Sequence, residues 1–114
     1  MARAVGIAQA STWYRKHAEL GKQMQMSQDG NEVCFVTIGD ASTSEGVFWE
    51  AINAAAVIKA PMAVSVWDDG YGISVPTSLQ TTKQSISRLL EGFHIDENGE
   101  GIYLYTCKAW DYPG

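Results

Sequence analysis

The stretch VCFVTIGDASTSEGVFWEAINAAAVIKAPMAVSVWDDG, residues 33–70, decides the fold. It contains two short apolar runs, 33–38 and 62–67, of which the first is rich in β-branched residues. Short continuous apolar runs of this kind are typical of strands that are buried on both faces of a sheet. The stretch therefore predicts two buried strands separated by a connection long enough to hold a helix.

The connection between these runs carries helix signals at both ends. Ser42 is followed three residues later by Glu45, which is the pattern of a capping box and predicts a helix beginning near Ser42. The helix is expected to run to about Ile58, because Pro61 follows and the residue before a proline avoids helical angles. Strand, helix and strand form a βαβ unit, whose two strands run parallel.

The flanking sequence adds three more elements. Residues 2–20 are rich in helix formers and Gly21 suits a helix end, so a helix is expected there. A second helix is predicted over Thr82–Glu91, and the alternating run Ile102–Cys107 predicts a third strand. The expected fold class is α/β with a parallel sheet.

Composition limits what the chain can be. With 114 residues it is about the size of one small domain, and 46% hydrophobic and 18% charged residues are typical of a globular protein. A net charge of −5 argues against nucleic acid or an anionic membrane as the main partner, since both require a basic surface. Cys34 and Cys107 are too few for a disulfide framework, so a cytoplasmic location is expected.

The ends of the chain favour a segment of a longer protein. The longest apolar region, 51–67, is interrupted by Asn53, Lys59 and Pro61, so no membrane span is predicted. The chain opens directly on a helical pattern and stops at Gly114, soon after a strand-like run. Residues 1–114 are therefore expected to be part of one domain.

Two acidic turns follow the two predicted strands. Asp40 follows the first strand and Asp69 follows the second. In a right-handed βαβ unit the carboxyl ends of both strands lie at one edge of the sheet, where open α/β sheets bind ligands. The sequence therefore predicts that these two carboxylates share one site.

The same edge should also attract an anion. The helix expected near Ser42 presents free N–H groups at its amino end, and the small residues Ala41, Ser42 and Thr43 allow close approach to the backbone. Carboxylates and an anion are compatible if a cation lies between them. Magnesium takes one or two carboxylates together with phosphate oxygens, which predicts a metal-bridged diphosphate.

Simpler interpretations of these residues remain open. Asp69-Gly70 is also a strong hairpin signal, with 62–67 and 71–75 as the two arms, and Gly39-Asp40 alone is compatible with an ordinary turn. His17 and His94 have no partner at catalytic spacing, and no nucleophile elbow, Walker-type loop or dinucleotide fingerprint is present.

The chain resembles a known family over about Ala2–Pro113, most specifically over 38–80. The matching positions are Gly39-Asp40-Ala41-Ser42, Glu45-Gly46, Asn53, Pro61 and Trp67-Asp68-Asp69-Gly70-Tyr71-Gly72-Ile73-Ser74. Together they are similar to the thiamine-diphosphate motif of the α-type half of the decarboxylase component of 2-oxo acid dehydrogenase complexes. The run GYGISVPTS, 70–78, resembles the branched-chain (2-oxoisovalerate) members more than the pyruvate members.

The resemblance implies a set of site residues. Asp40 and Asp69 would bind Mg²⁺ through their side chains, and Tyr71 would bind it through its backbone carbonyl. The implied cofactor-binding residues are Gly39, Asp40, Ala41, Ser42, Trp67, Asp69, Tyr71 and Gly72. No catalytic residue is implied within this chain, because neither histidine aligns with the family's active-site histidines.

Two departures from the family motif affect the implied site. Ala41 replaces a glycine, which requires a negative φ there. Asp68-Asp69 replaces Asn-Asn, which adds negative charge beside Asp40 and should make the metal-free site less favourable.

The resemblance also implies an activity and partners. The activity is thiamine-diphosphate-dependent oxidative decarboxylation of a branched-chain 2-oxo acid, with transfer of the acyl group to a lipoyl acyltransferase. The chain would act with a pyrimidine-binding β-type half, as a dimer or heterotetramer, and would be inactive alone. The alternatives are another thiamine-diphosphate enzyme, either transketolase-like or a pyruvate dehydrogenase, and a non-catalytic α/β interaction module.

Overall fold

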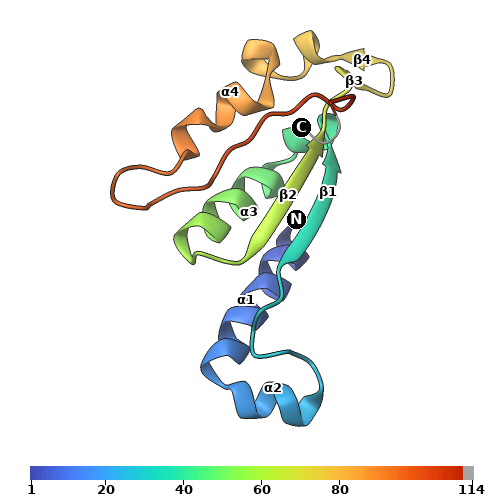
Figure 1. Ribbon diagram of the computed structural model, residues 1–114. Helices are drawn as coiled ribbons and strands as arrows, with labels where there is room; N and C mark the ends of the chain where they lie inside the picture. The colour runs from blue at the N-terminus through green and yellow to red at the C-terminus, as the bar shows by residue number, and fades with distance from the viewer. Residues whose placement is uncertain (112–114) are drawn as a thin grey trace.

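The computed structural model describes residues 1–111 (Figure 1). Its α-helices and strands are α1 (Ala2–Lys16), α2 (Ala18–Met24), β1 (Cys34–Gly39), α3 (Gly46–Val57), β2 (Met62–Trp67), β3 (Tyr71–Gly72), β4 (Val75–Pro76) and α4 (Ile86–Leu90). The 3-10 helices are η1 (Ala41–Ser44), η2 (Thr77–Leu79), η3 (Thr82–Gln84) and η4 (Glu91–Phe93). The fold is mixed α/β, with a small parallel sheet. Within residues 1–111, no helix combines the length and apolar character needed to cross a bilayer.

The two central strands are parallel, as predicted. β1 and β2 pair in register from Cys34 opposite Met62 to Gly39 opposite Trp67, and α3 connects them (Figure 1). The hairpin alternative for Met62–Trp67 is wrong, because β1 is the one strand within residues 1–111 that pairs with β2. The hairpin that does form is smaller, since β3 pairs with β4 antiparallel across Ile73 and Ser74.

The predicted capping box at Ser42 and Glu45 is wrong. α3 begins at Gly46, four residues later than expected, and Glu45 is its N-cap without a side-chain cap hydrogen bond. Residues 41–44 form η1 instead, because the Thr43 amide and hydroxyl both donate to the carbonyl oxygen of Asp40. A tight 3-10 turn therefore separates the strand end from the helix.

The strands are covered on one face, which corrects the prediction that both faces are buried. Burial alternates along β1, so that Phe35 is 68% exposed while Val36 and Ile38 are half-buried. The core lies on the α3 side of the sheet and is formed by Phe48, Ile52, Ile86 and Leu90, with Ile38, Val64 and Val66 packed against them. No element among residues 1–111 buries the Phe35 face.

The helix predicted over residues 2–20 is interrupted. His17 adopts φ −133° and ψ 54°, which ends α1, and Gly21 lies inside α2 rather than at a helix end. Gln25, in the left-handed conformation, caps α2. The His17 ring stacks on Trp13 at 4.2 Å between ring centroids, and its Nδ1 donates a hydrogen bond to the Trp13 carbonyl oxygen at 3.0 Å, which stabilises this break.

Two predictions in the last third of the chain are also corrected. The helix expected over Thr82–Glu91 is divided into η3, α4 and η4, and the left-handed φ of Lys83, 58°, separates η3 from α4. Ile102–Cys107 is not a strand, and its one ladder contact is an isolated bridge between His94 and Ile102. This segment passes beside α3 (Figure 1), and Ile102 and Leu104 pack against the core. Apolar residues alternate along it because every second side chain contacts the core, although no strand pairs with the segment.

A hydrogen-bonded loop ties α1 to the start of β1. The Ser11 hydroxyl donates to the carbonyl oxygen of Gly30 at 3.0 Å, and the Arg15 guanidinium donates to the same oxygen at 2.7 Å. Gly30 has a φ of 70°, and a Cβ there would lie 2.5 Å from the backbone nitrogen of Arg15, so only glycine fits. Glu32 completes the loop by accepting hydrogen bonds from Ser11, Ser27 and the Gln28 amide.

We expect Glu32→Gln to lower the thermal unfolding midpoint at pH 7. The hydrogen bond from the Gln28 amide, with further bonds from the Glu32 amide, Ser27 and Ser11, lowers the pKa of the Glu32 carboxyl from 4.5 to about 2. A carboxyl whose pKa is lowered by folding stabilises the protein above its unfolded pKa, and this contribution is lost as the pH falls from about 4.5 to about 2. The unfolding midpoints of the wild-type protein and of Glu32→Gln should therefore converge as the pH falls through that range. Glu97→Gln, at another exposed carboxylate, is the control, and an equal midpoint shift for the two variants would contradict this role of Glu32.

Candidate functional site

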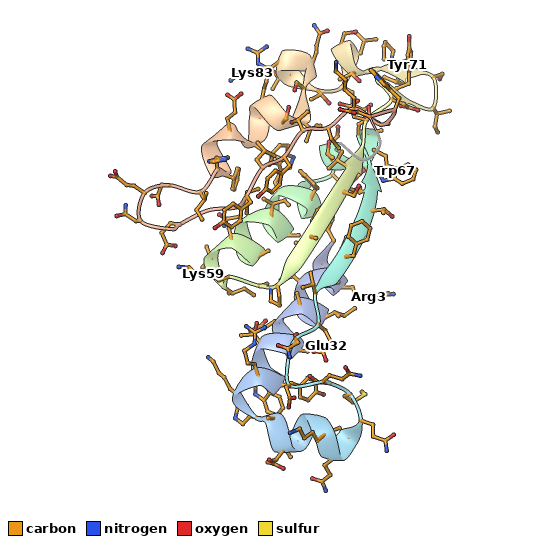
Figure 2. The ribbon with its side chains drawn as sticks, viewed as in Figure 1. Arg3, Glu32, Lys59, Trp67, Tyr71 and Lys83 are labelled. Atoms are coloured by element: carbon orange, nitrogen blue, oxygen red, sulfur yellow. The ribbon has the colours of Figure 1, made fainter. Side chains whose placement is uncertain are left out.

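An open cavity of about 980 Å³ lies at the carboxyl ends of β1 and β2. Its lining includes all eight residues predicted to bind the cofactor: Gly39, Asp40, Ala41, Ser42, Trp67, Asp69, Tyr71 and Gly72. Trp67 and Tyr71 mark this end of the molecule in Figure 2, while Glu32 lies at the opposite end of β1. The parallel pairing of β1 and β2 is what brings the two acidic turns, 29 residues apart in the sequence, to one place.

Asp40 is the buried carboxylate of this cavity. Asp40 is 5% exposed. Its backbone amide donates to the Trp67 carbonyl at 3.1 Å, which extends the pairing of β1 and β2 by one hydrogen bond. Its carboxylate oxygen Oδ2 accepts a hydrogen bond from the Thr77 hydroxyl at 3.4 Å. A buried carboxylate requires polar or cationic partners, so this position favours a cation.

Asp69 is exposed and belongs to the turn that follows β2. Its Oδ1 accepts a hydrogen bond from the Tyr71 amide at 3.0 Å, and the Oδ1 of Asp68 accepts one from the Gly70 amide at 3.1 Å. Both carboxylates therefore stabilise the turn, although the hairpin expected from Asp69-Gly70 does not form. Asp69 also lines the cavity, whereas Asp68 does not, so Asp69 alone of the pair is placed to act on a ligand there.

The first two residues of η1, Ala41 and Ser42, also line the cavity. The amides of Ala41 and Ser42 begin this turn and donate to no protein group within residues 1–111, as is usual for the first amides of a helix. Ala41 is not among the residues with positive φ, so its replacement of the motif glycine is accommodated without backbone strain. The amino end predicted near Ser42 therefore belongs to η1, and α3 begins beyond it.

Gly72 lies against η1 with no space for a side chain. A Cβ at Gly72 would lie 2.6 Å from the Ala41 Cβ and 2.7 Å from Oε1 of Gln80. Gln80 in turn donates from Nε2 to the Ala41 carbonyl at 3.0 Å. The 70–80 segment is thus held close to the turn that follows β1, and this contact closes one side of the cavity.

We expect Gly72→Ala to destabilise the protein by about 1–3 kcal/mol, because the added methyl overpacks against Ala41 and Gln80. Urea unfolding measures the change. Gly92→Ala is the matched control, since a Cβ at Gly92 meets no atom within 4 Å. Equal free energies of unfolding for the two variants would show that Gly72 and Ala41 are not in close contact.

Sequence reasoning missed the two polar residues that hold this arrangement together, Thr77 and Gln80. Both lie in a polar connection after Pro76, and no local pattern distinguishes them from solvated residues. Their role depends on the folding of 70–80 back over η1. Glu45 and Leu79 also line the cavity and had not been assigned to it.

The donor set fits a hard divalent cation. The candidate ligands are the carboxylates of Asp40 and Asp69 and the carbonyl oxygen of Tyr71, and oxygen ligands are those that Mg²⁺ prefers. Over residues 1–111, no three His, Cys, Asp or Glu side chains gather into a cluster able to hold a metal ion. Two carboxylates with a carbonyl leave coordination positions for phosphate oxygens and water, so a site of this kind does not need such a cluster.

Comparison with known proteins gives the family. The model of the dehydrogenase E1 component matches residues 2–97. The chain belongs to this family. The matched region includes the cavity and both acidic turns, so the resemblance expected from the motif residues is confirmed at the level of the family.

Two of the similar proteins are named as α subunits of dehydrogenases. The pyruvate dehydrogenase E1 component subunit alpha of Staphylococcus aureus is 38% identical over 87 residues, which is 71% of this chain and 24% of the relative. The 2-oxoisovalerate dehydrogenase subunit alpha 2, mitochondrial, of Arabidopsis thaliana is 42% identical over 62 residues, 54% of this chain and 13% of the relative. The chain thus matches about a quarter or less of the length of these curated relatives.

Proposed function

We propose that this E1-family chain binds Mg²⁺ and the diphosphate of thiamine diphosphate, as part of a 2-oxo acid dehydrogenase. The observation that supports this most is the common cavity of Asp40 and Asp69 at the tips of two parallel strands. Members of this family generally depend on thiamine diphosphate. Because the chain matches only part of its relatives, the activity, substrate and partners of the whole protein are included in the proposal.

The roles of the chain's own groups follow from their chemistry. Asp40 and Asp69 neutralise the charge of the metal ion, while the Ala41 and Ser42 amides donate to the diphosphate oxygens. Burial of Asp40 strengthens its attraction for a cation, because fewer water molecules screen it. The other predicted cofactor-binding residues that line the cavity are Gly39, Trp67, Tyr71 and Gly72.

The chain itself supplies no acid, base or nucleophile in this proposal. When bound, the cofactor would supply the electron sink that decarboxylation of a 2-oxo acid needs. The groups described here hold the metal and diphosphate end and so fix the position of the cofactor. The remaining parts of the enzyme are a pyrimidine-binding β-type half and a lipoyl acyltransferase that accepts the acyl group.

We propose a branched-chain 2-oxo acid as substrate, on the basis of the run 70–78. A pyruvate-type substrate is the alternative, favoured by the 38% identity with the Staphylococcus aureus subunit. The wider domain is proposed to be a three-layer α/β/α domain, of which residues 1–114 are one part, in a cytoplasmic protein. Assay of the full-length enzyme with 2-oxoisovalerate and with pyruvate separates the two substrates.

Calorimetric titration tests the binding proposal. Thiamine diphosphate is added to the chain, with and without Mg²⁺, both alone and with the pyrimidine-binding half supplied in trans. We expect binding that requires Mg²⁺ and an accompanying rise in the unfolding midpoint. Absence of Mg²⁺-dependent binding in both arrangements would contradict the proposal and favour the non-catalytic interaction module.

A further inference from the structure

We infer that Thr77 is a positioning residue that holds the two acidic turns of the metal site in a fixed relation. The inference rests on the proposed function of the cavity. Thr77 is the one residue within 1–111 that hydrogen-bonds both to the Asp40 side chain and to the turn containing Asp69 and Gly70.

The first connection is through the side chain. The Thr77 hydroxyl donates to Oδ2 of Asp40 at 3.4 Å, a long distance for this type of bond. Within residues 1–111 it is the one side-chain hydrogen bond to this buried carboxylate. A donor at Oδ2 occupies a lone pair of that oxygen and leaves Oδ1 without a protein donor, which favours coordination of a cation through one oxygen.

The second connection is through the backbone. The Thr77 amide donates to the Gly70 carbonyl at 2.9 Å, one residue after Asp69. The Thr77 carbonyl accepts hydrogen bonds from the amides of Gln80 at 3.0 Å and Thr81 at 2.8 Å. Thr77 is therefore fixed at three backbone bonds, which hold its backbone, and the base of its side chain, beside Asp40.

These two connections have a consequence for metal binding. Asp40 follows β1 and Asp69 follows β2, and the strand pairing ends at Gly39 and Trp67. Beyond that point Thr77 links the two turns. Its hydroxyl bonds to Asp40 in the first turn, and its amide bonds to Gly70 in the second. Residues that orient metal ligands by hydrogen bonds change metal affinity without touching the metal.

The test compares Thr77→Val, which replaces the hydroxyl by a methyl group, with Thr77→Ser, which keeps the hydroxyl. Apparent Mg²⁺ affinity is measured by calorimetry at saturating thiamine diphosphate, on the full chain with its pyrimidine-binding half. We expect Thr77→Val to weaken Mg²⁺ binding by about tenfold or more and Thr77→Ser to restore most of the affinity. Thr77→Ala, which also lacks the hydroxyl, should lose Mg²⁺ affinity to a similar extent. Thr106→Val, at an exposed position, should leave the Mg²⁺ affinity unchanged.

The unfolding midpoint of the metal-free protein separates positioning from general stability. A positioning role predicts weaker Mg²⁺ binding by Thr77→Val with little change in this midpoint. Wild-type affinity in Thr77→Val, or an equal loss in Thr77→Ser, would overturn the inference while leaving the proposed function in place. Failure of the wild-type protein to bind Mg²⁺ at all would overturn the proposed function, and this inference with it.

Discussion

Replacement of Phe48 by alanine is expected to destabilise the protein by about 3–5 kcal/mol. Phe48 is fully buried at the centre of a small core, where it packs with Ile52, Ile86 and Leu90 and meets Trp49 edge to face at 5.1 Å between ring centroids. Its removal leaves a cavity at the centre of this core, and the cavity adds to the lost free energy of burial. A loss of this size is a large fraction of the total stability of about 5–15 kcal/mol typical of native proteins.

Phe35→Ala is the matched control, because the same atoms are removed from a side chain that is 68% exposed. Its cost should be under about 1 kcal/mol, reflecting the lower strand propensity of alanine. Urea unfolding followed by circular dichroism gives both free energies. If Phe35→Ala costs as much as Phe48→Ala, the core does not lie on the α3 side of the sheet.

The second large effect is expected at the cavity. Asp40→Asn should weaken Mg²⁺-dependent thiamine diphosphate binding by on the order of 100-fold, since loss of the groups that merely support a metal ligand already costs 10- to 100-fold. The substitution keeps the shape of this buried side chain and an oxygen that can accept from Thr77. It removes the negative charge that balances the cation, so affinity should fall more than stability does.

Asp69→Asn is the matched comparison, with the same chemical change on the other acidic turn. We expect it to retain Mg²⁺-dependent binding, because Asn offers a side-chain oxygen and restores the residue that the family motif has at this position. The exposed turn should also persist, since the amide oxygen can still accept from the Tyr71 amide. Calorimetry that finds no binding by a folded Asp69→Asn protein would contradict the assignment of Asp69, and unchanged binding by Asp40→Asn would contradict that of Asp40.

The parallel strands and the position of the site were predictable because they depend on local patterns and on one topological rule. The runs 33–38 and 62–67 are apolar, the connection between them is helical, and such units place both carboxyl ends at one edge. Asp40 and Asp69 had to meet there once the strands were parallel.

The corrected features depend on contacts that no local pattern records. The start of α3 was misplaced because the Thr43 hydroxyl caps the Asp40 carbonyl, so a 3-10 turn forms where a capping box seemed complete. Ile102–Leu104 alternates like a strand because it packs on the core, although no strand pairs with it. Thr77 and Gln80 gain their roles because 70–80 returns across η1. This return brings them to hydrogen-bond partners that lie 37 and 39 residues away in the sequence.

The exposed indole of Trp67 gives the cavity a built-in optical signal. This ring is 70% exposed at the cavity wall, and its Nε1 donates to the Ser65 hydroxyl at 3.1 Å, which holds it in place. A molecule that fills the cavity would displace water from the ring, and a tryptophan that loses water contact emits at shorter wavelength. Occupancy of the cavity can therefore be followed by intrinsic fluorescence, without a label on either component.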